Sequence, residues 1–160
     1  MITILIAEDN PVNRELLREL LEGRSYEVLE ACDGRQALAM VEQIRPDLLL
    51  LDLGMPVLDG YATIRKIREN PNFAELPVLA VTAYAMRGDR EKILESGFDG
   101  YLSKPIHPPT LWAEIDRLLS KQDRLSSSRR IELEAKTAPV SPESKAKQQA
   151  AGAASPASES

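Results

Sequence analysis

The residues of this chain with the clearest chemical potential are acids, a hydroxyl and a lysine, each placed directly after an apolar run. They are Glu8-Asp9, Asp52, Thr82 and Lys104. Carboxylates that share one site repel one another and raise each other's pKa values, and a hard divalent cation such as Mg²⁺ relieves this repulsion. With a lysine and a hydroxyl beside the same acid, the set would form a cradle for a tetrahedral anion.

Each of these residues also has an ordinary interpretation. Glu8-Asp9 could be a helix-entry pair, and Asp52 could be an acid that caps a turn. Thr82 could be a residue that merely favours a strand, and Lys104 a solvated charge. The four interpretations are independent of one another, so all of them together are much less expected than any one alone.

The stretch from Pro46 to Gly60 indicates how the acid is positioned. Its four consecutive leucines, 48–51, are apolar on both faces of a strand, as a central parallel strand covered on both sides requires. Asp52 follows, and Gly54 and Pro56 then end the run. The acid is therefore expected at the carboxyl end of a buried strand, where open α/β sheets bind ligands.

The rest of the first 121 residues repeats this alternation of apolar runs and segments with helical periodicity. Such alternation predicts βαβ units and a parallel sheet, with helices on both of its faces. The carboxyl ends of all the strands then lie at one edge. We expect strands at 2–7, 26–31, 48–52, 77–82 and 100–103, and helices at 10–23, 33–45, 59–70, about 87–96 and 108–121.

Length, composition and charge exclude several classes of protein. The 160 residues, 43% of them hydrophobic, allow one ordinary domain with an appendage. No apolar run approaches the roughly 18 residues of a membrane span, and the N-terminus has no signal-peptide pattern. The single cysteine, Cys32, cannot form an intramolecular disulfide and fits a reducing cytoplasm. A net charge of −5 without a basic stripe argues against nucleic-acid binding.

The composition changes after about Lys121. Ser126-Ser127-Ser128 and the Ala-, Ser-, Pro-, Lys- and Gln-rich run to Ser160 cannot bury enough surface to offset chain entropy. Residues 129–136 could form a transient helix that is too short to be stable alone. We therefore predict a domain at 1–121 and a disordered low-complexity tail at 122–160, with no helix-turn-helix pattern.

Phosphoryl transfer is the chemistry that this set of residues favours. It needs little beyond positioning and the neutralisation of the equatorial oxygens, which a metal ion, a lysine and a hydroxyl supply. Asp52 is then the nucleophile that accepts a phosphoryl group as an aspartyl phosphate.

The motifs that carry this chemistry resemble the receiver domain of bacterial response regulators. They are Ile-Ala-Glu-Asp-Asn at 6–10, Leu-Asp-Leu-Gly-Met-Pro at 51–56 with Asp59-Gly60, Val-Thr-Ala at 81–83 and Lys-Pro at 104–105. The match covers residues 2 to about 120 with every motif in order. Residues 10–14 and 82–89 look most like DivK-type single-domain regulators and hybrid-kinase receivers. The resemblance implies a flavodoxin-like (CheY-like), doubly wound five-stranded parallel sheet of order 2-1-3-4-5.

The resemblance also implies a role for each site residue. Asp9 and Asp52 would bind Mg²⁺ through carboxylates, Gly54 through its backbone carbonyl and Glu8 through water. Glu8 stands where many members carry Asp, and the longer acid still reaches the water shell of the metal. Thr82 and Lys104 would bind phosphoryl oxygens, Lys104-Pro105 would be a cis peptide that aims the lysine inward, and Tyr101 would be the switch aromatic.

The resemblance further implies partners. A sensor histidine kinase or a histidine phosphotransfer protein would dock along Asn13, Leu17 and Pro105 and phosphorylate Asp52. The switched surface would be the fourth and fifth helices and the strand between them, about residues 86–119, and it would contact a downstream protein. We expect a cytoplasmic monomer or weak dimer. Gly54 and Tyr84 flank the path of an attacking water and would tune self-dephosphorylation.

Other functions remain as alternatives. Haloacid-dehalogenase-like phosphatases also form aspartyl phosphates, but they need a second acid where this chain has Gly54. A flavin or dinucleotide site would need a glycine- or hydroxyl-rich loop in place of Glu8-Asp9. A non-phosphorylated adaptor is the third alternative. We therefore expect a signalling module that catalyses its own phosphorylation and dephosphorylation, rather than an enzyme. His107 is expected to be an ordinary loop residue, Cys32 a small buried side chain and Trp112 an edge of the core.

Overall fold

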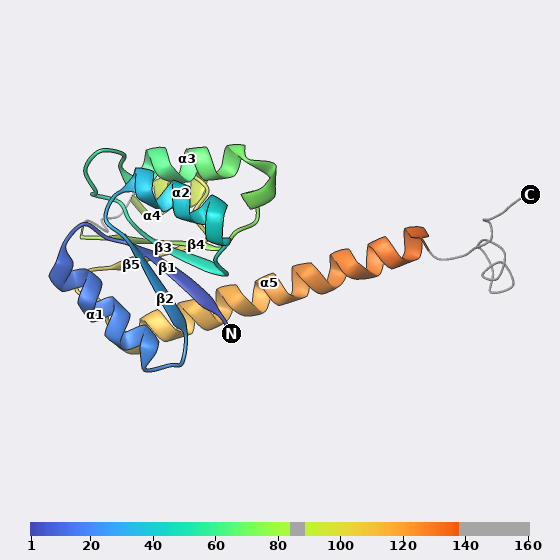
Figure 1. Ribbon diagram of the computed structural model, residues 1–160, viewed down its shortest axis with the longest axis horizontal. Helices are drawn as coiled ribbons and strands as arrows, with labels where there is room; N and C mark the ends of the chain where they lie inside the picture. Colours follow the sequence, from blue (N-terminus) through green and yellow to red (C-terminus); the bar gives the residue numbers. More distant parts are fainter. Residues whose placement is uncertain (84–88, 138–160) are drawn as a thin grey trace, which may run out of the picture. The chain divides into compact units, whose positions relative to one another are not determined.

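The sheet of this protein has five parallel strands in the order β2-β1-β3-β4-β5 (Figure 1). The computed structural model describes residues 1–83 and 89–137. The order and the doubly wound α/β class confirm the prediction. The strands are β1 (Thr3–Ala7), β2 (Glu27–Ala31), β3 (Leu48–Asp52), β4 (Val78–Thr82) and β5 (Gly100–Ser103).

Strand β3 lies at the centre of the sheet because both of its faces are apolar. All five of its residues are buried, and it pairs with β1 on one side and β4 on the other. Alternate leucines enter two separate cores, with Leu49 and Leu51 in one and Leu48 and Leu50 in the other. Asp52 is the last residue of this buried strand and stands at its carboxyl edge.

Helices cover both faces of the sheet and begin at the caps that the sequence indicates. The Asn10 side chain accepts hydrogen bonds from Val12 N and Asn13 N, and Asp33 and Asp59 cap their helices in the same way. The start of α5 packs with α1 on one face, and α2 and α3 lie on the other with α4. The helices are α1 (Pro11–Glu22), α2 (Gly34–Ile44), α3 (Gly60–Glu69), the short 3₁₀ helix η1 (Pro71–Phe73), α4 (Asp89–Glu95) and α5 (Pro108–Thr137).

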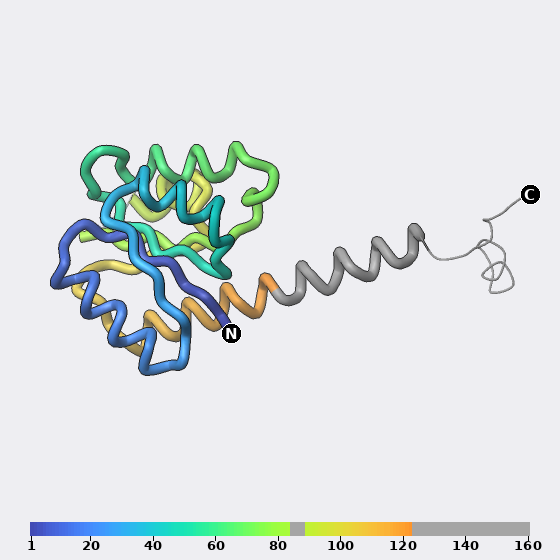
Figure 2. Tube along the Cα trace, viewed as in Figure 1, coloured from blue at the N-terminus to red at the C-terminus, as the bar shows by residue number. Residues whose placement is uncertain are grey.

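The helix α5 is longer than the sequence predicts. It continues to Thr137, whereas the expected end lies near Lys121. The chain divides into two units, Met1–Gln122 and Asp123–Ser160, and Figure 2 traces the first of them in colour, apart from residues 84–88. The composition of the second unit prevents a core but not a helix, because serine costs only a few tenths of a kcal/mol relative to alanine. The predicted disorder of residues 138–160 and the predicted role of Tyr84 fall outside the described residues, as does the expected start of the fourth helix at Arg87.

One half-buried arginine holds the amino edge of the sheet together. Arg68 of α3 pairs with Asp99 at 3.0 Å, and Asp99 also accepts a hydrogen bond from Val78 N at 2.9 Å. The guanidinium joins α3 to the segments before β4 and β5. It also donates to the carbonyl oxygens of Gly97, Phe73, Ala74 and Leu76. No helix in the described ranges is long and apolar enough to span a bilayer.

Candidate functional site

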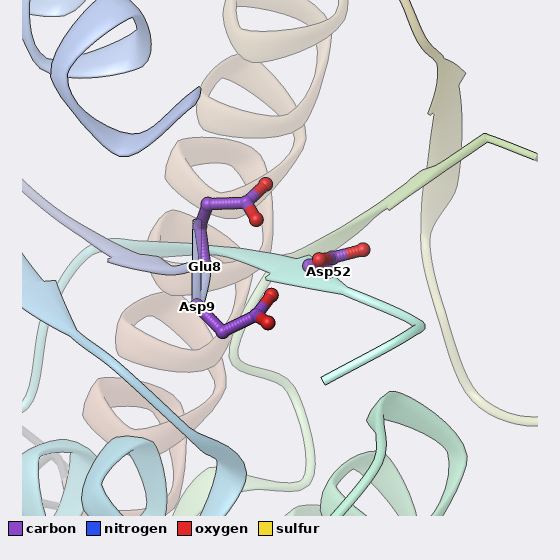
Figure 3. Close-up of side chains that lie close together, drawn as sticks. All are labelled: Glu8, Asp9 and Asp52. Carbon is purple, nitrogen blue, oxygen red and sulfur yellow. The ribbon is translucent and has the colours of Figure 1, made fainter. Parts of the chain in front are cut away.

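The carboxylates predicted to share a site do so at the carboxyl edge of the sheet. Glu8 and Asp9 follow β1, Asp52 ends the neighbouring strand β3, and Figure 3 shows their side chains converging. One carboxylate oxygen from each residue lies within 4.8 Å of the other two. Glu8 is 1% exposed and Asp52 is 7% exposed, while Asp9 faces solvent. The pair β1 and β3 is therefore what creates the acidic cluster.

Lys104 is the cation that this cluster contacts. Its Nζ lies 3.0 Å from Glu8 Oε1 and 3.5 Å from Asp52 Oδ2. Burial alone would lower the pKa of Lys104, but the hydrogen bond to Glu8 and the charges of both acids outweigh burial and raise it. Burial raises the pKa of Glu8 above its ordinary value, and the bond to Lys104 offsets only part of that rise. The lysine thus holds two buried acids that would otherwise repel each other.

A cavity of about 420 Å³ opens beside Asp52. Thr82, at the end of β4 and 4% exposed, lines it together with Asp52, Gly54 and Lys104. The backbone N of Lys104 donates to Thr82 O at 2.8 Å, and the Lys104–Pro105 peptide is cis. The predicted hydroxyl, lysine and acid therefore line one space that could hold a tetrahedral anion.

The donor set suits a hard divalent cation. All three converging ligands offer carboxylate oxygen, and Mg²⁺ prefers a few carboxylates with backbone oxygen and water. The amide of Gly54 donates to Asp52 Oδ1 at 3.2 Å, which orients the acid. Because Asp9 is exposed, water molecules can reach the site and complete the coordination of a bound cation. The residues that are present fit the metal that the sequence predicts.

The predicted docking residues lie together beside the site. Asn13 and Leu17 of α1 and Pro105 line a small cavity of about 110 Å³, to which Glu8 and Lys104 also contribute. Tyr101 lies elsewhere. It is half-buried in β5 and lines a third cavity, of about 570 Å³, between α4 and α5.

Other residues of the site were not predicted. Lys92 of α4 and Tyr61 of α3 line the cavity beside Asp52, and the Lys92 ammonium lies 4.7 Å from the centre of the Tyr61 ring. Their only sequence signal is helical spacing, which places side chains on a face without showing that the face borders a site. The contact of Arg14 with the backbone of Glu8 and Asp9 was likewise not predicted.

The residues set aside as ordinary behave in different ways. His107 is an exposed loop residue within 3.0 Å of Thr110 Oγ1, as expected. Trp112 packs at the edge of the core, with Arg24 5.0 Å from its ring. The expectation for Cys32 is wrong, because this side chain is exposed. It follows the last residue of β2, beyond the part of the strand that the helices cover.

Glu8→Gln is expected to stabilise the metal-free domain at pH 7 by an amount on the order of 1 kcal/mol. The folded pKa of Glu8 is raised above 4.5, so its ionised form costs stability above the folded pKa. That cost disappears as the pH falls to the unfolded value, and the gain disappears with it. Thermal melts in EDTA at pH 7 and near pH 4.5 measure both effects. Glu19→Gln, on the exposed face of α1, is the control, and equal behaviour of the two variants would contradict the prediction.

The fold and the acidic pocket define an α/β domain with a metal-compatible acid cluster at the carboxyl edge of a parallel sheet. The model of the response regulator receiver domain matches residues 4–116. The chain therefore belongs to the response regulator receiver family, which works in two-component signalling.

Known proteins support the assignment. The polar-differentiation response regulator DivK of Brucella anthropi is 38% identical over 107 residues, which are 67% of this chain and 87% of that protein. Hybrid signal transduction histidine kinase I of Dictyostelium discoideum is 41% identical over 135 residues, which are 78% of this chain but only 8% of the kinase.

Two solved structures share the fold. The receiver domain of a sensor histidine kinase from Pseudomonas aeruginosa PAO1 has a TM-score of 0.69 and 40% identity, covering 74% of this chain and 97% of that one. Its structure has a magnesium ion coordinated in the active-site cleft. The chemotaxis response regulator CheY4 of Vibrio cholerae has a TM-score of 0.70 and 30% identity, covering 74% and 98%.

Proposed function

We propose that this receiver domain is a switch controlled by phosphorylation of Asp52. The observation that carries the proposal is the cavity beside Asp52, which is also lined by Thr82 and Lys104 and lies next to the acidic pair Glu8-Asp9. A carboxylate alone would repel a phosphoryl group. Here a lysine, a hydroxyl and a cation site surround it, which is what a phosphoryl acceptor requires.

The acceptor reaction follows from this arrangement. An oxygen of the Asp52 carboxylate attacks the phosphorus of a phosphohistidine, and the new O–P bond forms as the P–N bond breaks. The imidazole leaves with the electron pair of the broken bond and takes a proton from solvent. Lys104 and Thr82 bind the phosphoryl oxygens. Bound Mg²⁺, held by Glu8 through water, by Asp9 and Asp52, and by the carbonyl of Gly54, would neutralise the charge on these oxygens.

The phosphoryl group would change the contacts of the domain on its far side. It adds roughly −1.5 to −2 charges at Asp52, and Thr82 moves toward it. Tyr101, on the neighbouring strand, then rotates inward. This alters the cavity of about 570 Å³ between α4 and α5. A downstream protein that prefers one state of α4, β5 and α5 reads the change.

The donor would be a protein of the kind that the relatives suggest. A sensor histidine kinase or a histidine phosphotransfer protein presents its phosphohistidine beside Asn13, Leu17 and Pro105. These residues line a cavity that shares Lys104 with the acceptor site. We propose that the domain acts in the cytoplasm as a monomer or weak dimer.

Incubation with a radiolabelled phosphohistidine donor tests the proposal. The chain is expected to take up label only with Mg²⁺, and uptake should fall at least a hundredfold in EDTA, because the acidic cluster is then left without its cation. Hydroxylamine should release the label, since it cleaves acyl phosphates. Metal-independent or hydroxylamine-stable label would overturn the proposal. No label, together with no shift in melting temperature on adding Mg²⁺ and beryllofluoride, would favour a non-phosphorylated adaptor.

A further inference from the structure

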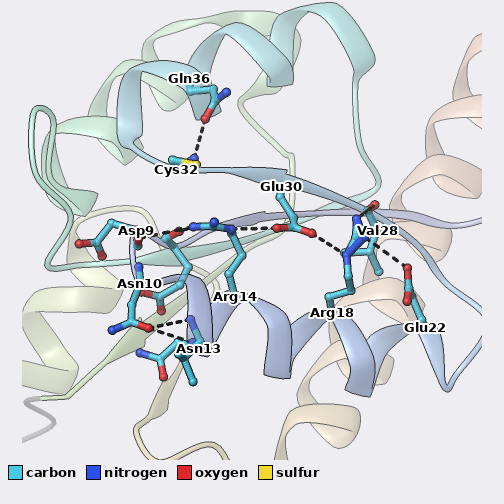
Figure 4. A network of polar contacts seen from close by, with 12 residues as sticks. Asp9, Asn10, Asn13, Arg14, Arg18, Glu22, Val28, Glu30, Cys32 and Gln36 are labelled. Carbon is cyan, nitrogen blue, oxygen red and sulfur yellow. Dashed lines mark hydrogen bonds and ion pairs between the residues drawn. The ribbon is translucent and has the colours of Figure 1, made fainter.

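A chain of charged side chains joins the acidic loop to α1 and β2 (Figure 4). Arg14 donates from Nη1 to the carbonyl oxygen of Glu8 at 2.8 Å and to that of Asp9 at 3.4 Å. Its Nε donates to Glu30 Oε1, on β2, at 2.8 Å. One guanidinium thus contacts the backbone of both acids that follow β1, and none of the roles proposed above uses it.

The position of Arg14 on the helix explains its reach. Side chains of an α-helix point toward its amino end, and Arg14 lies in the first turn and a half of α1. Its backbone N donates to Asn10 O at 2.9 Å, so its side chain passes back over the helix cap toward β1. The helix α1, which starts after Glu8 and Asp9, therefore also binds the backbone of these two residues through Arg14.

The polar groups of Glu8 are held from several directions. Its N donates to Ala31 O at 3.1 Å, its carbonyl accepts from Arg14, and its Oε2 accepts from Asn10 N at 3.1 Å. With Glu8 only 1% exposed, a carbonyl that lost its donor would cost about 1–3 kcal/mol or would turn to find another. Such a turn would move the carboxylates of Glu8 and Asp9 relative to Asp52.

Glu30 keeps the charge of Arg14 from opposing a cation. It pairs with Arg14 at 2.8 Å and with Arg18 at 2.5 Å, and Arg18 also lies 3.7 Å from Glu22. The side chains of Arg14 and Glu30 are only 17% and 28% exposed, so solvent screens their interaction weakly. The network thus fixes the guanidinium plane and balances its charge close to the site.

We propose that Arg14 is a positioning residue for the divalent-cation site, acting through the backbone of Glu8 and Asp9, with Glu30 holding it in place. This inference rests on the proposed function, because it requires that Mg²⁺ bind the acidic cluster. Residues that orient metal ligands without touching the metal typically change metal affinity by 10- to 100-fold when replaced.

Titration of the full chain with Mg²⁺ in a calorimeter tests the inference. Arg14→Met is expected to raise the Mg²⁺ dissociation constant about tenfold. A small acyl phosphate donor gives a second reading: the Mg²⁺ concentration for half-maximal labelling should rise by a similar factor, while the rate at saturating Mg²⁺ stays within about twofold. A general loss of stability would not raise the half-maximal Mg²⁺ concentration while leaving the rate at saturating Mg²⁺ unchanged.

Two further variants sharpen the result. Arg68→Met removes an equally embedded arginine that also binds backbone carbonyls, but at the opposite edge of the sheet. It is expected to lower the melting temperature and leave Mg²⁺ affinity unchanged. Arg14→Lys keeps the charge but loses the guanidinium that donates to Glu8 and Glu30 at the same time. This variant is expected to bind Mg²⁺ more weakly than wild type and more tightly than Arg14→Met.

The outcomes separate the inference from the proposed function. If wild type binds Mg²⁺ and folded Arg14→Met binds it equally well, the inference alone is overturned. If Arg14→Met does not fold, the comparison of Arg14→Lys with wild type decides, and equal affinities overturn the inference. If wild type shows neither heat of binding nor a melting shift with Mg²⁺, the inference falls together with the metal-dependent part of the proposed function.

Discussion

Asp52→Ala is expected to abolish phosphoryl uptake from a phosphohistidine donor, with labelling at least a thousandfold below wild type. The methyl group has no oxygen to form the bond to phosphorus, and Glu8, the other acid that Lys104 contacts, is 1% exposed and cannot replace it. Phosphorimaging of the separated protein measures the loss, and calorimetry should show weaker Mg²⁺ binding because one ligand is gone.

Asp47→Ala is the matched control for this prediction. Asp47 precedes the same strand β3 at its opposite end, where its side chain accepts a hydrogen bond from Thr3 N at 2.8 Å. It should be labelled as wild type is, with at most a modest loss of stability from the missing bond. Persistent hydroxylamine-sensitive label in Asp52→Ala would show that a different carboxylate is the acceptor.

Gly60→Ala is expected to destabilise the domain by about 2 kcal/mol and to lower its melting temperature by roughly 5–10 °C. A Cβ at Gly60 would lie 2.7 Å from Leu53 Cα and 2.9 Å from Asp52 O. These are backbone atoms at and directly after the end of β3, which cannot rotate away as a flexible side chain can. The higher helix propensity of alanine offsets less than 1 kcal/mol of this strain.

Gly54→Ala provides the comparison for this second variant. It lies in the same loop, but a Cβ there would meet no atom within 4 Å, so its melting temperature should stay within about 2 °C of wild type. Thermal melts in EDTA keep any metal effect out of the measurement. Equal melting temperatures for Gly60→Ala and wild type would mean that the loop yields without cost, contrary to the close packing of α3 on β3.

The sheet, and the site residues at its carboxyl edge, were predictable from the sequence because buried strands leave runs of apolar residues. Leucines 48–51, bounded by Pro46 and Gly54, favour a strand covered on both faces, and the acids and the lysine follow such runs directly. Parallel strands then bring those ends together without any knowledge of loops. Topology therefore brings Glu8, Asp9 and Asp52 to one edge, and the contacts of the residues that follow β1 set the final approach within 4.8 Å.

Other features depend on contacts that no local pattern encodes. Arg14 meets Glu30 only because β2 pairs with β1 in the register that sets Ile6 against Glu30. The cation–π contact of Lys92 with Tyr61 likewise depends on how α4 packs beside α3. The length of α5 was not predicted for a different reason. Composition indicates whether a segment can build a hydrophobic core, but a helix can form without one.

The hydrogen bond from Lys104 N to Thr82 O, at 2.8 Å, has a consequence for the switch that we propose. It joins the backbones of the two residues that would hold the phosphoryl oxygens. A shift of the end of β4 therefore carries the lysine with it, because a bond of this kind tolerates little stretching. When Thr82 or Lys104 binds the phosphoryl group, the other residue is brought within hydrogen-bonding distance of it. In the proposed switch, Thr82 and Lys104 should therefore move together toward the phosphoryl group rather than one after the other.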